Sequence, residues 1–279
     1  MAKVNMADVK ALRERTGAGL TDVKKALEEA DGNMDAAIDI IRTRGLAKAA
    51  KREGNVATEG LVAIKVKDLT GSQVATVIEL NAETDFVVKN ARFMALAEEV
   101  LDAVADADAD SVEAAGNAKL GNGTVAEAIV DASGILGERV VLGKVQRVTG
   151  PAITTYLHKT SPDLPASLGV VVVHDEAAAP VAKSVAQHIA FADPQWRTRA
   201  DVPADVVAHE TEVFRAQTLE EGKPEAALPK IVEGRMNGFY KENVLEEQAL
   251  AQDSKTTVAK HVAATGGNVL DFARVKVGA

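Results

Sequence analysis

The side chains whose types and spacing best suggest chemistry are Asp85 and Phe86, which stand together within residues 79–90. An acid directly before a bulky aromatic residue could be presented as a wedge, with a carboxylate beside an apolar tip. The alternative is a helix start, in which Thr84 or Asp85 caps the helix and Phe86 packs into the core. On spacing alone, the helix start is the stronger interpretation.

The second half of the chain offers a control for this segment. Its corresponding link between a predicted strand and a predicted helix is residues 174–177 (His-Asp-Glu-Ala), which lacks the aromatic residue. Aromatic residues make up only 3% of the chain. If Phe86 served only the repeated architecture, the second copy would be expected to keep it.

Other chemical motifs fail on their spacing. Residues 137–144 resemble a phosphate-binding loop, but they hold five spacer residues instead of four, and Val145 stands where Ser or Thr must reach magnesium. His209 begins a zinc-protease pattern that fails because Val213 occupies the second histidine position. Cysteine is absent, so thiolate metal sites and a cysteine nucleophile are excluded. We therefore expect no enzymatic activity, no cofactor and no resident metal.

The charge distribution favours a protein partner over a nucleic acid. The chain of 279 residues carries a net charge of −9. Residues 1–56 hold eleven Lys and Arg against nine Asp and Glu, which leaves 21 against 32 in the remainder. An acidic body repels phosphates and suits a partner with basic patches. No signal peptide is visible at residues 1–5, and the longest apolar run, 168–173, is too short to cross a bilayer, so we expect a cytoplasmic protein.

The elements that position these residues follow from the periodicity. Apolar residues at i, i+3, i+4 and i+7 predict three short helices, which pack as a small bundle over 1–43. A basic linker over 44–60 follows and contains three glycines. The fold class is α+β, with an N-terminal three-helix domain preceding a two-part core of antiparallel sheets.

The core is predicted in two related halves. The first half, 61–150, contains a β-hairpin, the Thr84–Val87 segment and a helix. The acidic run 105–110 is expected to be solvated, and the Asp- and Gly-rich stretch 105–123 as a whole is assigned no role. The second half, 151–279, repeats the order of hairpin and helix, so the sequence suggests a weak internal duplication. It also contains a projecting helical hairpin at about 202–250 and a last strand at 269–277 that could return to its sheet.

Four segments together resemble the elongation factor Ts family. They cover the chain from residue 9 to about 240, and the first is long and specific. The segments are residues 9–27, 54–57 (Gly-Asn-Val-Ala), 84–87 (Thr-Asp-Phe-Val) and 232–236 (Val-Glu-Gly-Arg-Met).

The resemblance implies a guanine nucleotide exchange factor of translation elongation. Its partner would be elongation factor Tu, which itself binds GDP or GTP and magnesium. In the family, the Asp-Phe pair enters the GTPase near its magnesium site, and by position this role falls to Asp85 and Phe86, flanked by Thr84 and Val87. The second half would contact another domain of the GTPase, and His158 stands where the family can place a contacting histidine.

The resemblance also implies that the three helices of residues 1–43 are a ubiquitin-associated-like docking domain, which would bind the nucleotide-binding domain of the partner. The candidate docking residues are Leu12, Leu20 and the loop Gly17-Ala18-Gly19. For Leu12 a place in the small core is the stronger interpretation, whereas for Leu20 a core and a docking role are evenly balanced. The oligomeric state stays open between a homodimer through the core and a one-to-one complex with the GTPase.

Two further hypotheses compete with the exchange factor. The basic run at 42–52 could bind RNA, which predicts salt-sensitive binding, although the acidic remainder and the lack of an aromatic platform count against it. An unrecognised enzyme would show turnover without a GTPase, but no residue set supports one.

Overall fold

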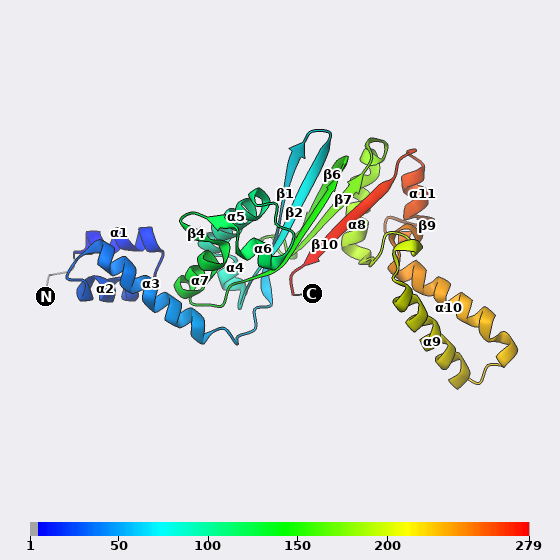
Figure 1. Cartoon of the computed structure of the whole chain (residues 1–279), viewed down its shortest axis with the longest axis horizontal. Helices are drawn as coiled ribbons and strands as arrows, with labels where there is room; N and C mark the ends of the chain where they lie inside the picture. The colour runs from blue at the N-terminus through cyan, green and yellow to red at the C-terminus, as the bar shows by residue number, and fades with distance from the viewer. Residues whose placement is uncertain (1–4, 279) are drawn as a thin grey trace.

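The computed structural model describes residues 5–278. Residues 1–4, which open the predicted docking domain and the stretch searched for a signal peptide, lie outside this range, as does residue 279 at the end of the predicted second half. The molecule is elongated, with α1–α3 at one end, two sheets in the middle and the hairpin of α9 and α10 at the other end (Figure 1). The predicted α+β class is confirmed.

Three helices form the N-terminal part: α1 (Met6–Thr16), α2 (Leu20–Glu29) and α3 (Met34–Lys51). The side chain of Asn33 caps α3 by accepting from the backbone N–H groups of Asp35 and Ala36. Gly17 ends α1 in the left-handed conformation, with φ of 66°. The apolar stripes of the three helices pack on each other in one small core, which contains Val9, Leu12, Ala18, Val23, Ala26, Leu27, Ala37 and Ile41.

The third helix is longer than the sequence predicts. It runs to Lys51, so residues 44–51 of the predicted linker are helical. Gly45 lies inside this helix and packs against Gly134 of another helix, where a side chain at position 134 would overlap the backbone of Gly45. Residues 46–51 are Leu, Ala, Lys, Ala, Ala and Lys, all strong helix formers, and this local propensity reinforces the tertiary contact.

The first sheet is antiparallel and has the strand order β1-β2-β5. Its strands are β1 (Glu59–Leu69), β2 (Ser72–Ala82) and β5 (Val141–Gly150), and Leu69 pairs with Ser72 beside the turn at Gly71. The helices α5 (Ala91–Asp106), α6 (Val112–Gly116) and α7 (Val125–Leu136) accompany this sheet, together with the short pair β3 (Lys119–Leu120) and β4 (Gly123–Thr124).

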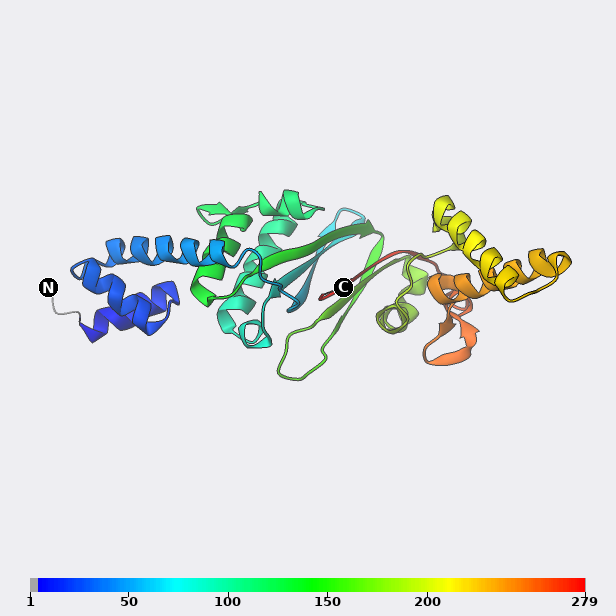
Figure 2. The ribbon, with the colours of Figure 1, turned by 90° about the horizontal axis from the view of Figure 1, so that it is seen from below.

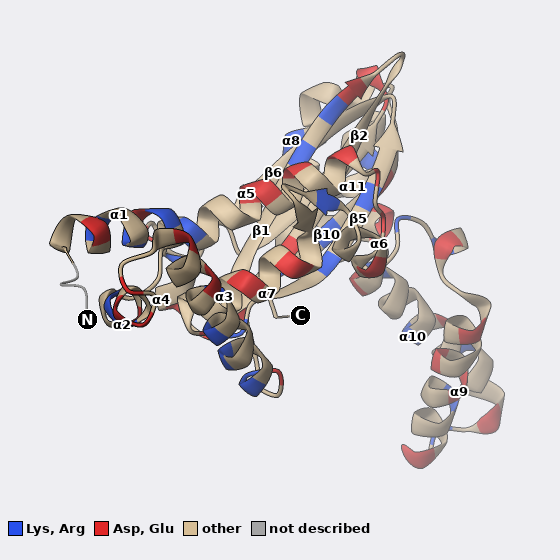
Figure 3. Cartoon of the chain, turned by 60° about the vertical axis from the view of Figure 1, so that its left-hand side comes forward, with Lys and Arg blue, Asp and Glu red and all other residues tan. Residues whose placement is uncertain are grey.

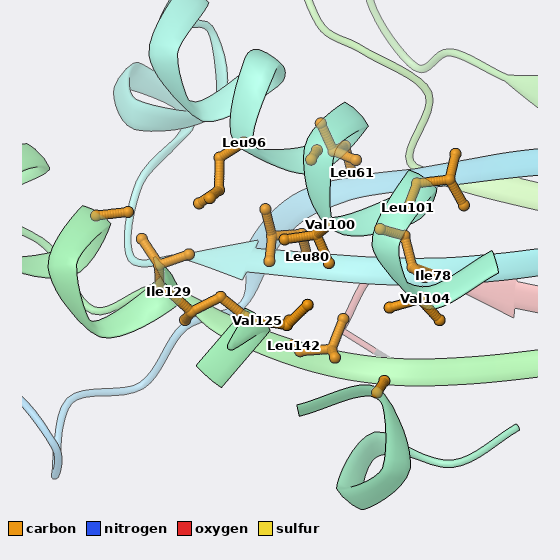
Figure 4. Close-up of a cluster of buried hydrophobic side chains, with 14 of the residues drawn as sticks. Leu61, Ile78, Leu80, Leu96, Val100, Leu101, Val104, Val125, Ile129 and Leu142 are labelled. Atoms are coloured by element: carbon orange, nitrogen blue, oxygen red, sulfur yellow. The ribbon is translucent and has the colours of Figure 1, made fainter. Parts of the chain in front are cut away.

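Aliphatic side chains fill the space between this sheet and its helices (Figure 4). Those labelled in the figure are Leu61, Ile78, Leu80 and Leu142 from the strands, Leu96, Val100, Leu101 and Val104 from α5, and Val125 and Ile129 from α7. The acidic run 105–110, which was expected to be solvated, contributes as well. Ala105 and Ala109 are buried, while Asp106 and Asp108 pair with Lys67 and Arg147 at 2.5 and 2.8 Å, so alternation of small and charged residues places this stretch against the sheet.

The second sheet has the order β10-β7-β6 and is also antiparallel. It comprises β6 (Ala152–His158), β7 (Leu168–His174) and β10 (Val269–Lys276), which confirms the predicted return of the last strand. Its helices are α8 (Ala179–Ala192) and α11 (Val258–Ala263), and the short pair β8 (Ala249–Leu250) and β9 (Asp253–Thr257) precedes α11. Single 3₁₀ turns occur at η1 (Glu176–Ala178), η2 (Arg199–Asp201), η3 (Glu225–Ala227) and η4 (Leu245–Glu247).

The two sheets share one order of elements, which supports the predicted duplication. Each has a hairpin, a helix, an insertion, a short two-stranded pair, a helix and a third strand that pairs with the second strand of the hairpin. Thr124 and Thr257 cap the second helix in the two halves. The sheets meet through a separate apolar cluster, which contains Val62, Ala75, Val77, Val171, Ala273 and Val275.

The predicted helical hairpin consists of α9 (Ala204–Glu220) and α10 (Leu228–Asn243). It extends from the end of the second half (Figures 1 and 2). The buried side chains of its helices are Thr218, Leu228 and Met236, so two helices alone give little burial. At its base the guanidinium of Arg199 lies 4.3 Å from the ring centroid of Tyr240. No helix within residues 5–278 combines the length and apolarity needed to cross a membrane.

His188 is buried in the second half in its neutral form. Its Nδ1 accepts from the backbone N–H of Ala251 at 3.1 Å, which leaves Nε2–H to donate to Gln248 Oε1 at 2.9 Å. Burial lowers the pKa of His188 below its ordinary value.

We therefore expect His188 to make stability fall in acid. The unfolded chain binds the proton near pH 6.5 and the folded chain resists it, so the free energy of unfolding decreases as the pH falls below about 6.5, by at most about 1.4 kcal/mol per pH unit. Urea unfolding of the native chain and of His188→Gln between pH 5 and 7.5 measures this. The native chain should lose more stability than the variant, whereas parallel pH profiles would contradict the assignment.

Candidate functional site

The Thr-Asp-Phe-Val segment forms the start of α4 (Asp85–Val88), a four-residue helix between β2 and α5. Val87 and Val88 are buried and anchor it in the first core, whereas Phe86 is 80% exposed. The helix-start interpretation is therefore wrong for Phe86, whose ring does not enter the core. It is also wrong for capping: Thr84 is the N-cap by position, but its side chain makes no capping hydrogen bond.

Lys89 pairs with the carboxylate of the same segment. Its ammonium donates to Asp85 at 2.8 Å, one helical turn away, and lies 6.0 Å from the centroid of the Phe86 ring. The hydrogen bond to Asp85 raises the pKa of Lys89. The pair is partly exposed, and such pairs are weak and easily exchanged. A partner can therefore compete for the Asp85 carboxylate.

A glutamate from a distant part of the chain holds the start of α4. Glu138 accepts from the backbone N–H of Thr84 at 2.9 Å and from its hydroxyl at 2.6 Å. Glu138 belongs to residues 137–144, where the phosphate-loop resemblance was rejected. Gly137 ends α7 with φ of 75° and β5 begins at Val141, so this segment is a helix-to-strand link.

Glu83 is the second carboxylate at this site. Its Oε1 accepts from the backbone N–H of Arg139 at 2.6 Å and from Arg52 at 3.1 Å, and its Oε2 accepts from the side chain of Asn55 at 2.9 Å. Hydrogen bonds from Asn55, from the Arg139 backbone and from Arg52 lower the pKa of Glu83 against the effect of burial. Sequence reasoning missed Glu83 and Glu138. Asn55 could have been found from the sequence, because it lies in the Gly-Asn-Val-Ala segment that resembles the family.

The candidate docking residues occupy different environments. Leu12 is 0% exposed and Ala18 is buried, so both belong to the small core, as favoured for Leu12. Leu20 is 52% exposed at the start of α2, and Gly19 is exposed immediately before it. Gly17 lies directly beneath the guanidinium of Arg92, which occupies the space that a side chain at position 17 would need.

The contact between Gly17 and Arg92 brings the docking loop close to the wedge segment. Arg92 lies in the first turn of α5, a few residues after Phe86. Figure 3 shows α1 and α2 at the same end of the molecule as α4. Leu20 and Phe86 are therefore carried by elements at the same end of the molecule.

His158 lies apart from these residues, at the end of β6 in the second half. It is exposed, and its Nδ1 is 3.1 Å from the hydroxyl of Tyr156. Both line a groove of about 390 Å³ together with Phe191, which is 81% exposed. This second exposed aromatic surface was not found from the sequence, because Phe191 carries no recognisable motif.

The basic run at 42–52 is mostly engaged within the chain. Ion pairs join Arg42 to Asp131, Arg44 to Glu29, Lys48 to Asp22 and Arg52 to Glu83. The end of α3 remains visibly basic (Figure 3), and these pairs are about as exposed as that of Lys89 with Asp85. The RNA hypothesis is therefore opposed by the acidic remainder of the chain and not by this pairing. Among the residues that the structure describes, no group of three or more His, Cys, Asp or Glu side chains could hold a metal ion.

Comparisons with known proteins agree on one family. The profile of the family described as Elongation factor TS matches residues 83–279. The chain is 52% identical over 281 residues to the elongation factor Ts of Beutenbergia cavernae, 50% identical over 279 residues to that of Clavibacter michiganensis and 48% identical over 282 residues to that of Renibacterium salmoninarum. In each case the match covers 100% of both chains.

Phe86 is exposed and Phe93 is buried, which predicts a small and a large loss of stability when each is replaced by alanine. Phe86→Ala should change the free energy of unfolding by no more than about 0.5 kcal/mol, because its ring is in water. Phe93→Ala, which removes a fully buried ring of the first core, should cost about 3–5 kcal/mol. Urea titrations of both variants test this. A loss above about 2 kcal/mol for Phe86→Ala would mean that the ring packs in solution.

Proposed function

The chain belongs to the elongation factor Ts family, and on that premise we propose that it binds GDP-bound elongation factor Tu and promotes release of GDP. It is an exchange factor of translation elongation and not an enzyme. The observation that carries the mechanism is the exposure of Phe86 beside Asp85 on a short helix whose next two residues are buried. A partner in translation also implies a cytoplasmic location.

In the proposed mechanism Asp85 and Phe86 disturb the magnesium site of the GTPase. Magnesium requires near-octahedral oxygen ligands and bridges protein and phosphate, so its displacement leaves the phosphates of GDP less neutralised. Phe86 occupies a gap between helices of the partner. Asp85 exchanges its ion pair with Lys89 for hydrogen bonds that hold the partner's loops in the distorted state. Thr84 and Val87 hold the helix that presents the pair.

The wedge needs additional binding energy from elsewhere in the interface. Burial of a Phe side chain contributes about 1.5–3 kcal/mol, whereas a shift of an equilibrium by about 10⁴-fold needs about 5.5 kcal/mol. We assign the remainder to docking by Leu20 and Gly19, which Leu12, Gly17 and Ala18 hold in place, and to a second contact around His158.

The proposed roles follow the predicted division of the chain. Residues 1–43 dock, 44–60 connect, 61–150 present the wedge, and 151–279 make the second contact. The scheme needs no homodimer, because one chain carries all of the proposed contacts.

We predict that Phe86→Ala strongly reduces exchange. With a fluorescent GDP analogue on purified elongation factor Tu, the native chain should accelerate release, and Phe86→Ala should lower the maximal rate by about 10- to 100-fold, as expected from losing about 1.5–3 kcal/mol. Asp85→Ala/Phe86→Ala should lose more. Leu69→Ala, another exposed apolar residue at the β1–β2 turn, serves as the control. Full activity of the double variant would exclude the wedge, and inactivity of the native chain would exclude the function.

A docking role for Leu20 predicts a different kinetic effect. Leu20→Ala should raise the half-saturating concentration in the same titration by about tenfold, the effect of losing about 1.4 kcal/mol, and leave the maximal rate unchanged. The matched control is Leu46→Ala, which removes an exposed leucine from α3. A reduced maximal rate with unchanged half-saturation would argue against docking.

A further inference from the structure

Three segments far apart in the sequence meet at the carboxylate of Glu83. They are the end of α3 with its following turn, the link that precedes Thr84, and the link between α7 and β5. Arg139 closes the arrangement, since its guanidinium donates to the backbone oxygen of Asn55 at 2.5 Å while its backbone N–H donates to Glu83. Donors thus surround both carboxylate oxygens.

The same links join the docking helices to the wedge. α3 packs on α7 at the contact between Gly45 and Gly134, and Arg42 pairs with Asp131 of α7 at 3.4 Å. The residue after α7, Gly137, leads directly into Glu138, which holds Thr84. At the far end of α3, Arg52 and Asn55 bind the residue immediately before Thr84. Figure 2 shows the end of α3 and the connector after it reaching the helices of the first half.

We propose that Glu83 is a positioning residue that couples the docking helices to the wedge. The inference rests on the proposed exchange function and assigns a role to a residue that need not touch the partner. Without the bonds of Glu83, α3 would still pack on α7, but the residue before Thr84 would lose its attachment to the end of α3. With them, binding of the first helices places Phe86 in a defined orientation, and misplacement of a group by about 1 Å can cost about 100-fold in rate.

The hydrogen bonds of Glu83 allow the proposal to be tested with two near-isosteric substitutions. Glu83 only accepts hydrogen bonds, so Glu83→Gln preserves shape but removes the charge that strengthens the bonds from Arg52 and Arg139. Its amide also donates, and Asn55 can accept from it only by rotating its own amide away from the native donor position. The added change Asn55→Asp supplies an acceptor for that amide, and the remaining oxygen of the substituted side chain again accepts from Arg52 and Arg139. The double variant therefore restores the pairing and the net charge. Glu246→Gln, at a carboxylate paired with Arg197 at 2.9 Å in the second half, is the matched control.

The first readout is exchange on elongation factor Tu. We expect Glu83→Gln to lower the maximal rate by about tenfold with little change in the half-saturating concentration, since a hydrogen bond to a charged group is lost. The double variant should recover most of this rate, and the control should match the native chain. The proposal would be overturned if Glu83→Gln left the maximal rate unchanged or changed mainly the half-saturating concentration. It would also be overturned if the double variant did not recover the rate.

The second readout needs no partner and therefore separates this proposal from the exchange function. The chain contains no cysteine, so spin labels can be placed at Lys25→Cys, on the exposed face of α2, and at Phe86→Cys. The distance distribution should be narrow in this labelled chain, broader when Glu83→Gln is added and narrow again with Asn55→Asp. An unchanged width in the Glu83→Gln chain would contradict the coupling, even if exchange proceeds. A native chain without exchange activity would overturn the proposed function and leave the distance measurement to decide the coupling.

Discussion

An exposed phenylalanine can serve as a wedge only if the backbone that carries it cannot collapse to bury the ring. Phe86 meets this condition because burial of Val87 and Val88 fixes one side of the short helix and the hydrogen bonds of Glu138 to Thr84 fix its start. The ring itself contributes nothing to its own support. The hydrophobic effect that would draw it inward is opposed by anchored neighbours on both sides, and the apolar surface stays available to a partner.

The duplicated architecture shows how an ordinary link can be adapted to this presentation. In the second half Asp175 directly follows β7, as Glu83 directly follows β2 in the first half. Asp175 accepts from both nitrogens of Asn268 and from the backbone N–H of Ala178, and these bonds lower the pKa of Asp175. Each of the two acids therefore accepts from the backbone of the link that precedes the third strand of its sheet. Only in the first half does an exposed aromatic residue, Phe86, follow this acid, beside the partly exposed pair of Asp85 and Lys89. The same frame therefore serves structure in one copy and, in the proposed mechanism, recognition in the other.

Local patterns could predict the elements but not the environment of the site. Helical periodicity identified α1–α3 and the hairpin of α9 and α10, and alternation with turn residues identified both β-hairpins. The length of α3 was missed because Gly45 favoured a break, although residues 46–51 are strong helix formers and the contact with Gly134 supports the continued helix. Glu138 and Glu83 were missed because their partners lie 54 and 56 residues away, beyond the reach of local spacing. The orientation of Phe86 depends on these contacts, which is why spacing alone favoured the wrong environment.

The most direct test compares binding affinities with and without GDP, instead of measuring a rate of GDP release. The affinity of this chain for elongation factor Tu should be measured by calorimetry with and without GDP, for the native protein and for Phe86→Ala. Coupling is reciprocal, so GDP must weaken binding of this chain by the factor by which the chain weakens GDP binding. The account predicts a large factor for the native chain and a much smaller one for Phe86→Ala, while the variant still binds the GDP complex. Equal factors for the two proteins would show that the exposed ring does not discriminate between the two states of the GTPase.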